Sequence, residues 1–194
     1  DKKVKNKEQE DGRIAMENLN EEMLQALTEK MSSLYVSYRK RFVLSIPGAS
    51  MFTPKRKNGE FTALTDHMLT NHLRHKYAVA IYSGESASKF LCFDVDDGSA
   101  DTVHTIIDRL VAFGIPQDKI YVSFSGGKGY HVELFFDRLV YTSQLYALYG
   151  MVIEQVKLNP RKVEFRPTYG NAIKLPLSIH GKTGNVCWFV EPET

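Results

Sequence analysis

The sequence predicts an α/β fold of the α+β type, in which helices cover a largely antiparallel sheet. Segments typical of a strand, a helix, two strands, a helix and a strand follow one another from Phe90 to Arg166. That order is the split βαβ pattern. The chain has 194 residues and 43% hydrophobic content, enough to bury one substantial core or two small modules that share one. We therefore expect a two-layer core with an N-terminal module of helix and strand beside it.

Composition narrows the class of protein. No apolar run approaches the roughly 18 residues of a membrane span, and the charged start of the chain has no signal-peptide apolar region. Cys92 and Cys187 stand far apart, so neither a zinc site nor a disulfide framework is expected. We expect a cytoplasmic protein without a membrane partner. The formal net charge of +2 does not by itself indicate a nucleic-acid partner.

The N-terminal module is predicted over residues 13–88, after a polar, lysine-rich and therefore flexible terminus at residues 1–12. Its first helix runs from Arg13 to about Tyr38 with Asn20 as candidate N-cap. The inward stripe of this helix comprises Met23, Leu27, Met31 and Leu34. The segment from Tyr77 to Tyr82 reads as a strand. We expect it to lie beside the strand that starts near Lys89, in one sheet.

A short helix capped by Thr65 carries Met68, Leu69 and Leu73 inward. The spacing of His72 and His75 could suit a metal, but no acidic residue lies nearby in sequence, so we favour ordinary polar histidines.

The C-terminal module, residues 89–194, supplies the remaining elements. Helices are predicted at 101–113 and 142–156, and strands at 120–125, 130–136, 162–166, 172–177 and 186–190. The first of these helices is expected to cover the sheet.

The segment from Lys89 to Asp97 is an apolar strand that turns acidic at its end. Alternate residues of a strand share a face, so Asp94 and Asp96 project together, with α-carbons roughly 6.6 Å apart. Two carboxylates at this spacing repel unless a cation lies between them, which suits Mg²⁺ or Mn²⁺ held with a substrate phosphate. Asp97 falls on the opposite face and is expected to begin the turn. A plain strand end is the alternative, because Asp-x-Asp is a short pattern.

A glycine-rich segment, Ser125-Gly-Gly-Lys-Gly-Tyr-His131, joins two of the predicted strands. Glycines let the backbone approach a ligand, and Ser125, Lys128 and His131 are donors for phosphate oxygens. A Walker A loop is excluded, because Lys128 is followed by glycine and a strand rather than by Ser or Thr and a helix. An ordinary hairpin is the alternative.

Three further segments complete the candidates. Glu164 alternates with apolar residues on a short strand and could add a third carboxylate. Lys174, His180 and Lys182 offer cations or donors at the end of the strand that follows. The basic turn 55–59 could contact phosphates, although such runs are more often simply solvated.

Taken together and in this order, these segments resemble the catalytic core of the archaeo-eukaryotic primase (primase-polymerase) superfamily. The resemblance rests on Phe-Asp-Val-Asp from Phe93, the segment from Ser125 to His131, the acid Glu164, and the stretch from Ile173 to Gly184. It covers about residues 64–190 and is closest to the primase domains of TOTE conflict systems and to CRISPR-associated primase-polymerases. It implies an RRM-like sheet within one primase-polymerase domain, residues 13–194, whose catalytic module is residues 89–194.

The resemblance also implies a template-dependent nucleotidyltransferase that makes or extends primers. It implies that Asp94, Asp96 and Glu164 are the catalytic residues and hold two divalent ions, Mg²⁺ or Mn²⁺. It places the NTP or dNTP on Ser125, Gly127, Lys128, His131, Lys174, His180 and Lys182. Lys174 stands where many members have arginine, which keeps the charge but loses bidentate recognition. Candidates for template contacts are Arg39, Arg41, Lys55, Arg56 and Lys57.

A monomer acting on a DNA or RNA template and primer is expected, in a prokaryotic cell, nucleoid-associated or encoded by a mobile element. Helicase or CRISPR proteins outside this chain are candidate partners. Two rival functions are a non-catalytic nucleic-acid-binding replication module of the same fold and a metal-dependent nucleotide-sugar transferase. Binding a polyanion does not require three carboxylates, and a sugar transferase leaves His131 and His180 without a role.

Overall fold

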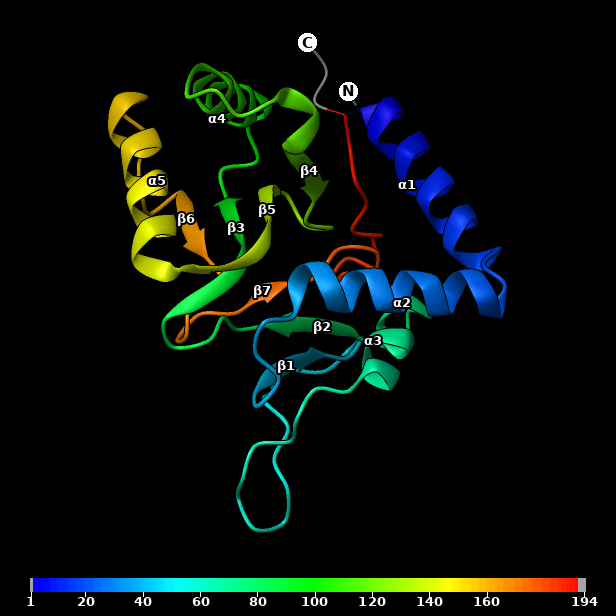
Figure 1. Cartoon of the computed structure of the whole chain (residues 1–194). Helices are drawn as coiled ribbons and strands as arrows, with labels where there is room; N and C mark the ends of the chain where they lie inside the picture. The colour runs from blue at the N-terminus through cyan, green and yellow to red at the C-terminus, as the bar shows by residue number, and fades with distance from the viewer. Residues whose placement is uncertain (1, 192–194) are drawn as a thin grey trace.

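The computed structural model describes residues 2–191, with side chains from residue 10 onward. It is a mixed α/β structure with two antiparallel sheets (Figure 1). The helices are α1 (Lys2–Glu17), α2 (Glu21–Tyr35), α3 (Asp66–Leu73), α4 (Ala100–Ala112) and α5 (Thr142–Gln155), with a 3-10 turn at Gln117–Lys119. The strands are β1 (Phe42–Ser45), β2 (Ala78–Ile81), β3 (Ala87–Val95), β4 (Tyr121–Phe124), β5 (Tyr130–Tyr141), β6 (Val163–Arg166) and β7 (Ile173–Lys174).

The larger sheet has the strand order β4-β5-β3-β6, and every neighbouring pair is antiparallel. The chain builds it as β3, α4, β4, β5, α5, β6. This is the predicted split βαβ order, and the RRM-like, mostly antiparallel sheet is confirmed. The register sets Asp94 on β3 opposite His131 on β5 and Glu164 on β6. Directly opposed residues share a face, so the polar candidates of three strands lie on one side.

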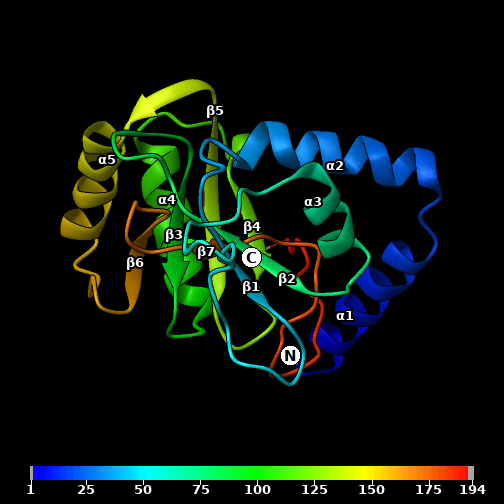
Figure 2. The same cartoon turned by 90° about the horizontal axis from the view of Figure 1, so that it is seen from below.

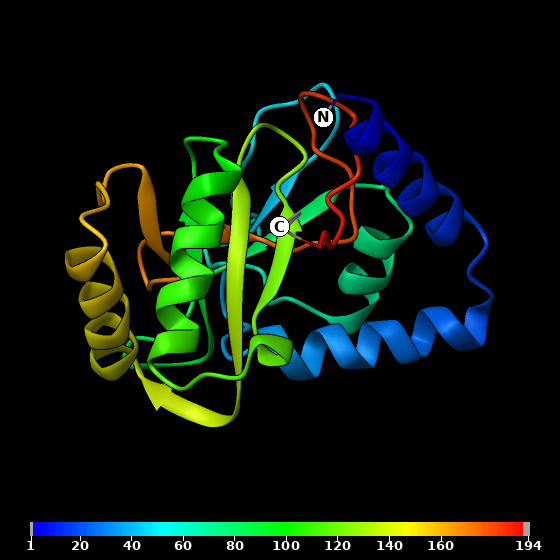
Figure 3. The same ribbon diagram turned by 90° about the horizontal axis from the view of Figure 1, so that it is seen from above.

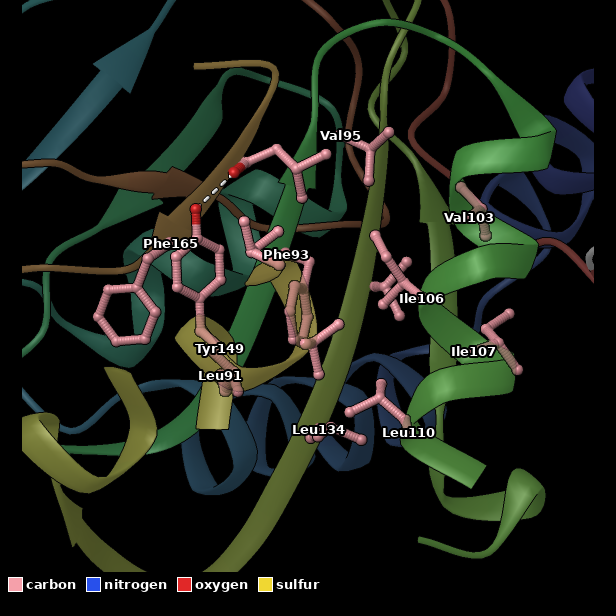
Figure 4. Packing of buried hydrophobic residues seen from close by; sticks show 14 of the residues in the cluster. Leu91, Phe93, Val95, Val103, Ile106, Ile107, Leu110, Leu134, Tyr149 and Phe165 are labelled. Carbon is pink, nitrogen blue, oxygen red and sulfur yellow. Dashed lines mark hydrogen bonds between the residues drawn. The ribbon is translucent and has the colours of Figure 1, made fainter. Parts of the chain in front are cut away.

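Helices α4 and α5 cover the other face of this sheet (Figures 2 and 3). The predicted stripe of α4 is confirmed, because Val103, Ile106, Ile107 and Leu110 are all buried. They pack with Leu91, Phe93 and Val95 of β3 and with side chains of α5 (Figure 4). Tyr149 on α5 donates from Oη to the Val163 carbonyl oxygen at 2.6 Å, which joins α5 to β6.

The smaller sheet, β1-β2-β7, packs against the opposite side of the larger one with α2 and α3. Asn20 and Thr65 cap these helices as predicted, each accepting from the backbone N–H three residues later. The predicted stripe of α2 is confirmed for Met31, and Leu27 and Leu34 pack against the same core, but it is wrong for Met23. Met23 is 52% exposed, whereas Leu24, Thr28, Met31 and Tyr35 are buried. Tyr35 of α2 packs edge to face against Phe90 of β3. The side of α2 that carries Tyr35 is therefore the one that meets the larger sheet.

Three predictions about strands are also wrong. β2 does not lie beside β3, because β1 and β7 take both edges of β2, while β5 and β6 take both edges of β3. The predicted strand at 172–177 shortens to Ile173–Lys174, since Pro176 has no N–H and Leu177 has a φ of 66°. The segment 186–190 contains isolated bridges at Val186 and Phe189 instead of a strand.

Helix α1 begins at Lys2, within the segment where the sequence predicted a flexible terminus. A Cβ at Gly12 would lie 2.8 Å from the Trp188 ring, so glycine permits this contact between α1 and the C-terminal segment. The division into modules at residues 12 and 88 stays a prediction. Among the described residues, no helix is long and apolar enough to cross a membrane.

Candidate active site

Three carboxylates meet at the edge where β3 ends. Asp94 lies on β3 opposite Glu164 of β6, and Asp96 follows β3 with its N–H donating to the Lys162 carbonyl oxygen at 2.8 Å. Carboxylate oxygens of Asp94, Asp96 and Glu164 all lie within 4.8 Å of one another. Burial, and next the charge of Asp96, raise the pKa of Asp94 to about 7. The strand alternation therefore brings together the acidic triad that the sequence indicated.

This triad fits a hard divalent cation. Mg²⁺ and Mn²⁺ prefer carboxylate oxygens, and three acidic side chains with oxygens this close repel one another until positive charge lies among them. Asp97 does not join them. Its two oxygens accept from the Ser99 N–H and the Thr102 hydroxyl at 2.9 and 2.8 Å, so it begins the turn into α4 as predicted.

The glycine-rich hairpin sits directly against the acidic end of β3. A Cβ at Gly129 would lie 2.5 Å from the Val95 carbonyl oxygen, and one at Gly98 would lie 2.6 Å from the Lys128 carbonyl oxygen. Only glycine permits both close approaches. The Ser125 N–H closes the hairpin by donating to the Gly129 carbonyl oxygen at 2.9 Å. Backbone contact thereby fixes the donors of the hairpin beside the carboxylates.

β7 and the segment after it flank the hairpin on its other side. Lys174 donates from Nζ to the Ser125 carbonyl oxygen. Thr183 donates from Oγ1 to the Gly126 carbonyl oxygen at 2.6 Å. A Cβ at Gly127 would lie 3.5 Å from His180 Nε2. Burial, then Lys174 and Lys182, lower the pKa of His180. Ser125, Gly127, Lys174 and His180 are therefore neighbours, although they come from distant parts of the sequence.

His131 lies beneath the acidic triad rather than at the surface. Its Nε2 lies 3.6 Å from Asp94 Oδ1, and its side chain is only 5% exposed. Burial, and next the Lys174 ammonium, lower the pKa of His131 to about 3. The imidazole is thus neutral at physiological pH and can offer one donor and one acceptor. Lys128 and Lys182, by contrast, are exposed on the hairpin and on the segment after β7.

Sequence reasoning missed two charged residues of this face. Arg166 donates from Nη2 to Glu164 Oε2 and places Nε 3.7 Å from Asp94 Oδ2. Glu133 is fully buried, and its Oε2 accepts from the Tyr35 hydroxyl at 2.8 Å. Burial raises the pKa of Glu133 to about 8. Both positions lie two residues from a predicted one, Glu164 or His131, and strand alternation was the available signal.

The predicted template residues lie just before β1 and in the loop that follows it. The loop between β1 and α3, which carries Lys55, Arg56 and Lys57, projects away from both sheets (Figure 1). Arg41 stacks on the Tyr82 ring at 3.9 Å and lies 5.0 Å from the Tyr169 ring centre. Arg39 instead pairs with Asp66 at 2.8 Å and donates to the Leu64 carbonyl oxygen at 3.1 Å, so it ties α3 to the preceding loop.

His72 has a structural role. It accepts from the Val79 N–H through Nδ1 at 2.9 Å, and Nε2 bonds the Pro176 carbonyl oxygen at 2.7 Å. Both ring nitrogens are engaged, which confirms the prediction that His72 is an ordinary polar histidine.

Comparisons with known proteins agree with this architecture. Residues 24–194 match the family described as the TOTE conflict system, Archaeo-Eukaryotic Primase domain. The primase-polymerase AEP domain of cyanophage S-2L is 16% identical with a TM-score of 0.51, and the match covers 80% of this chain and 82% of that one. The polymerase domain of Mycobacterium tuberculosis Ligase D, solved in complex with DNA, is 13% identical with a TM-score of 0.54, covering 88% and 80%. No curated protein matches the sequence.

The solved structures establish a shared fold at this level of identity, and the family match extends over nearly the whole chain. The chain belongs to the family of archaeo-eukaryotic primase domains found in TOTE conflict systems.

Proposed function

We propose that this domain is a template-dependent nucleotidyltransferase that synthesises or extends primers from NTP or dNTP. The observation that carries the proposal is the acidic triad, whose oxygens lie within 4.8 Å of one another beside a glycine-rich hairpin flanked by cations. Family membership supports the same class of reaction. Phosphoryl transfer depends mainly on placement and electrostatic stabilisation, and these residues are suited to both.

Asp94, Asp96 and Glu164 are the residues that would hold two divalent ions, Mg²⁺ or Mn²⁺. Such ions would stabilise the charge that develops on the entering and leaving oxygens. Asp94 must lose its proton to serve as a ligand, and its raised pKa makes metal affinity increase with pH around 7.

The triphosphate would lie on the opposite wall of the site. Gly127 leaves its backbone accessible, and Lys128 and Lys182 project cations from the two segments that face one another there. Lys174 holds the Ser125 carbonyl oxygen, so it orders the hairpin as well as contributing charge. His131 and His180, both neutral at physiological pH, would donate hydrogen bonds to phosphate oxygens.

A DNA or RNA template and primer would approach from the side of the β1–α3 loop. This loop combines three cations, at positions 55–57, with the exposed Phe61 ring, and Lys55 Nζ lies 5.3 Å from the centre of that ring. Cations and exposed rings together suit single-stranded nucleic acid, because phosphates pair with the cations and bases stack on rings. The DNA complex of the Ligase D polymerase domain supports a nucleic-acid partner. We propose that the domain acts as a monomer, with any helicase or CRISPR protein supplied by other chains.

Replacement of one exposed ligand tests the function with little risk to folding. Asp96→Asn should reduce incorporation of labelled nucleotide on a primed template by at least about a thousandfold, because the acid is proposed to touch metal directly. Asp108→Asn is the matched control, since it removes an exposed carboxylate of α4. A folded Asp96→Asn protein that extends primers at the wild-type rate contradicts the proposal. Hydrolysis of sugar nucleotides without polymerisation would favour the transferase alternative.

A further inference from the structure

A guanidinium lies against two carboxylates of the acidic triad. Arg166 follows Glu164 by two residues on β6, so both side chains project to the same face. Arg166 Nη2 donates to Glu164 Oε2, and Arg166 Nε lies 3.7 Å from Asp94 Oδ2. The cation therefore bridges two of the three carboxylates that we propose as metal ligands.

This bridge differs from the surface ion pairs of the protein. The side chains of Arg166 and Asp94 are 19% and 17% exposed, whereas Glu21, the partner of Arg74, is 85% exposed. Solvent screens the exposed pair almost completely. A guanidinium shielded from water needs close acceptors, and three neighbouring carboxylates need a cation. Arg166 thus supplies the cation that the carboxylates need, and the carboxylates supply the acceptors that Arg166 needs.

A divalent ion and Arg166 would compete for the same oxygens. The carboxylate lone pairs that accept from the guanidinium are the ones that a metal ion requires as ligands. Like charges at this distance also repel strongly, because the site is only partly exposed to water. The negative charge of three carboxylates is smaller than the positive charge of two divalent ions and a guanidinium together. Entry of metal therefore favours release of the arginine.

We propose that Arg166 is a built-in counter-ion of the acidic triad, which holds Asp94 and Glu164 together before metal binds and yields them to the entering ion. Arg166 is in this sense a positioning residue that sets the metal affinity of the free domain. A bound triphosphate adds negative charge to the site, so nucleotide and metal binding reinforce one another. The inference rests on the metal-dependent function proposed above.

Direct measurement of Mn²⁺ binding tests the inference without an activity assay. The whole 194-residue chain is titrated with Mn²⁺ in the absence of nucleotide, and free Mn²⁺ is followed by electron paramagnetic resonance. Arg166→Gln should bind Mn²⁺ about tenfold more tightly than wild type, since a neighbouring cation changes the proton affinity of a carboxylate by a factor of ten or more. Arg161→Gln, which removes an exposed cation just before β6, should stay within about twofold.

The outcomes separate the two proposals. Absence of Mn²⁺ binding by both wild type and Arg166→Gln overturns the metal-dependent function itself. Wild-type binding with equal or weaker affinity in Arg166→Gln overturns the counter-ion and leaves the function standing. Arg166→Lys covers the case in which the Gln variant does not fold. Its shorter side chain keeps the charge but cannot span both carboxylates, so it should bind Mn²⁺ more tightly than wild type by a smaller factor, and equal or weaker affinity again contradicts the proposal.

A second readout follows from the same geometry. In EDTA, Arg166→Gln should unfold at a lower temperature than wild type, because its carboxylates lack a counter-ion. Addition of Mn²⁺ should raise the unfolding temperature of the variant by more than that of wild type. An equal increase in the two proteins contradicts competition between the arginine and the metal.

Discussion

The two faces of β3 differ in their side chains and in what those side chains contact. Leu91, Phe93 and Val95 point toward α4 and α5 and are fully buried among apolar side chains. Cys92 and Asp94 point the other way, toward the opposing Glu133 and His131 of β5. Since successive side chains of a strand alternate, a single segment can supply both a core and a chemical site. The first face packs only into the core beneath α4 and α5, whereas the second joins Phe90 and Cys92 to the other core and also carries the charge.

Burial of acids on the charged face lowers the free energy of unfolding, and burial of apolar side chains must offset this loss. The pKa of Asp94 and that of Glu133 are both raised, chiefly by burial, which means that folding disfavours their ionised forms. Glu133 Oε1 is also buried without a hydrogen-bond partner among the described residues. Retention of poorly solvated acids is expected where catalysis or binding needs them. Substitutions that target one face at a time can test this separation.

The largest effect is expected from Asp94→Asn on activity. Nucleotide incorporation should fall by at least about a thousandfold, which corresponds to roughly 4 kcal/mol of barrier. The free energy of unfolding without metal should stay the same or rise at pH 8, because the variant no longer buries an ionised acid. Incorporation assays and urea unfolding measure the two quantities. A large loss of stability in this variant would break the separation of the faces.

Phe93→Ala should show the opposite behaviour. The ring is fully buried and lies 5.5 Å from that of Tyr149, so its removal leaves a cavity between β3 and α5. We expect a loss of about 3–5 kcal/mol in the free energy of unfolding. Met23→Ala, at a half-exposed position of α2, should change it by no more than about 0.5 kcal/mol. Similar losses in both variants would contradict the assigned core.

Glu133→Gln tests how much a buried acid on the charged face destabilises the fold, through the pH dependence of the free energy of unfolding. Burial raises the pKa of Glu133 from 4.5 to about 8, so the folded state binds a proton more tightly than the unfolded state. The stabilisation from that proton is complete below about pH 4.5 and is lost as pH rises through 8. Compared with wild type in EDTA, the variant should retain about 4 kcal/mol more of its stability between pH 5 and pH 9. Parallel pH profiles would show that Glu133 is solvated.

The smallest effect is expected at Tyr149→Phe. The hydroxyl donates to the Val163 carbonyl oxygen at 2.6 Å behind the apolar face, while the ring packs against Phe93 (Figure 4). Loss of the donor should reduce the free energy of unfolding by about 1 kcal/mol and leave Mn²⁺ affinity unchanged. A marked loss of Mn²⁺ affinity would show that α5 also positions Glu164.

Local pattern was sufficient to predict the larger sheet and its helices. The period of α4 and the alternation along β3 and β5 are properties of single segments, and the split βαβ order fixes how they assemble. Pairing of the smaller sheet was not predictable in this way. β2 and β3 are neighbours in sequence, yet distant β7 occupies the edge of β2. The burial of Leu24 in place of Met23 likewise depends on which side of α2 meets the sheet.

The candidate site likewise contains residues that local pattern predicted and residues that it did not. Asp94, Asp96 and Glu164 stood out because acids interrupt apolar strands, and the register brings their oxygens together. Arg166 and Glu133 were not predicted, because the sequence pattern of a single strand does not show which residues lie opposite on the neighbouring strands. Only pairing across strands shows that Arg166 faces Cys92 and Asp94, and that Glu133 reaches Tyr35 on a distant helix.

The most direct test of the account is the position of Mn²⁺ in crystals of the domain. Anomalous scattering from crystals soaked in Mn²⁺ and a non-hydrolysable nucleotide should give a peak about 2.0–2.3 Å from oxygens of Asp94, Asp96 and Glu164. The Arg166 guanidinium should have moved away from Glu164 in the same crystals. A Mn²⁺ peak elsewhere on the protein, with the acidic triad empty and Arg166 still bound to Glu164, would contradict the account.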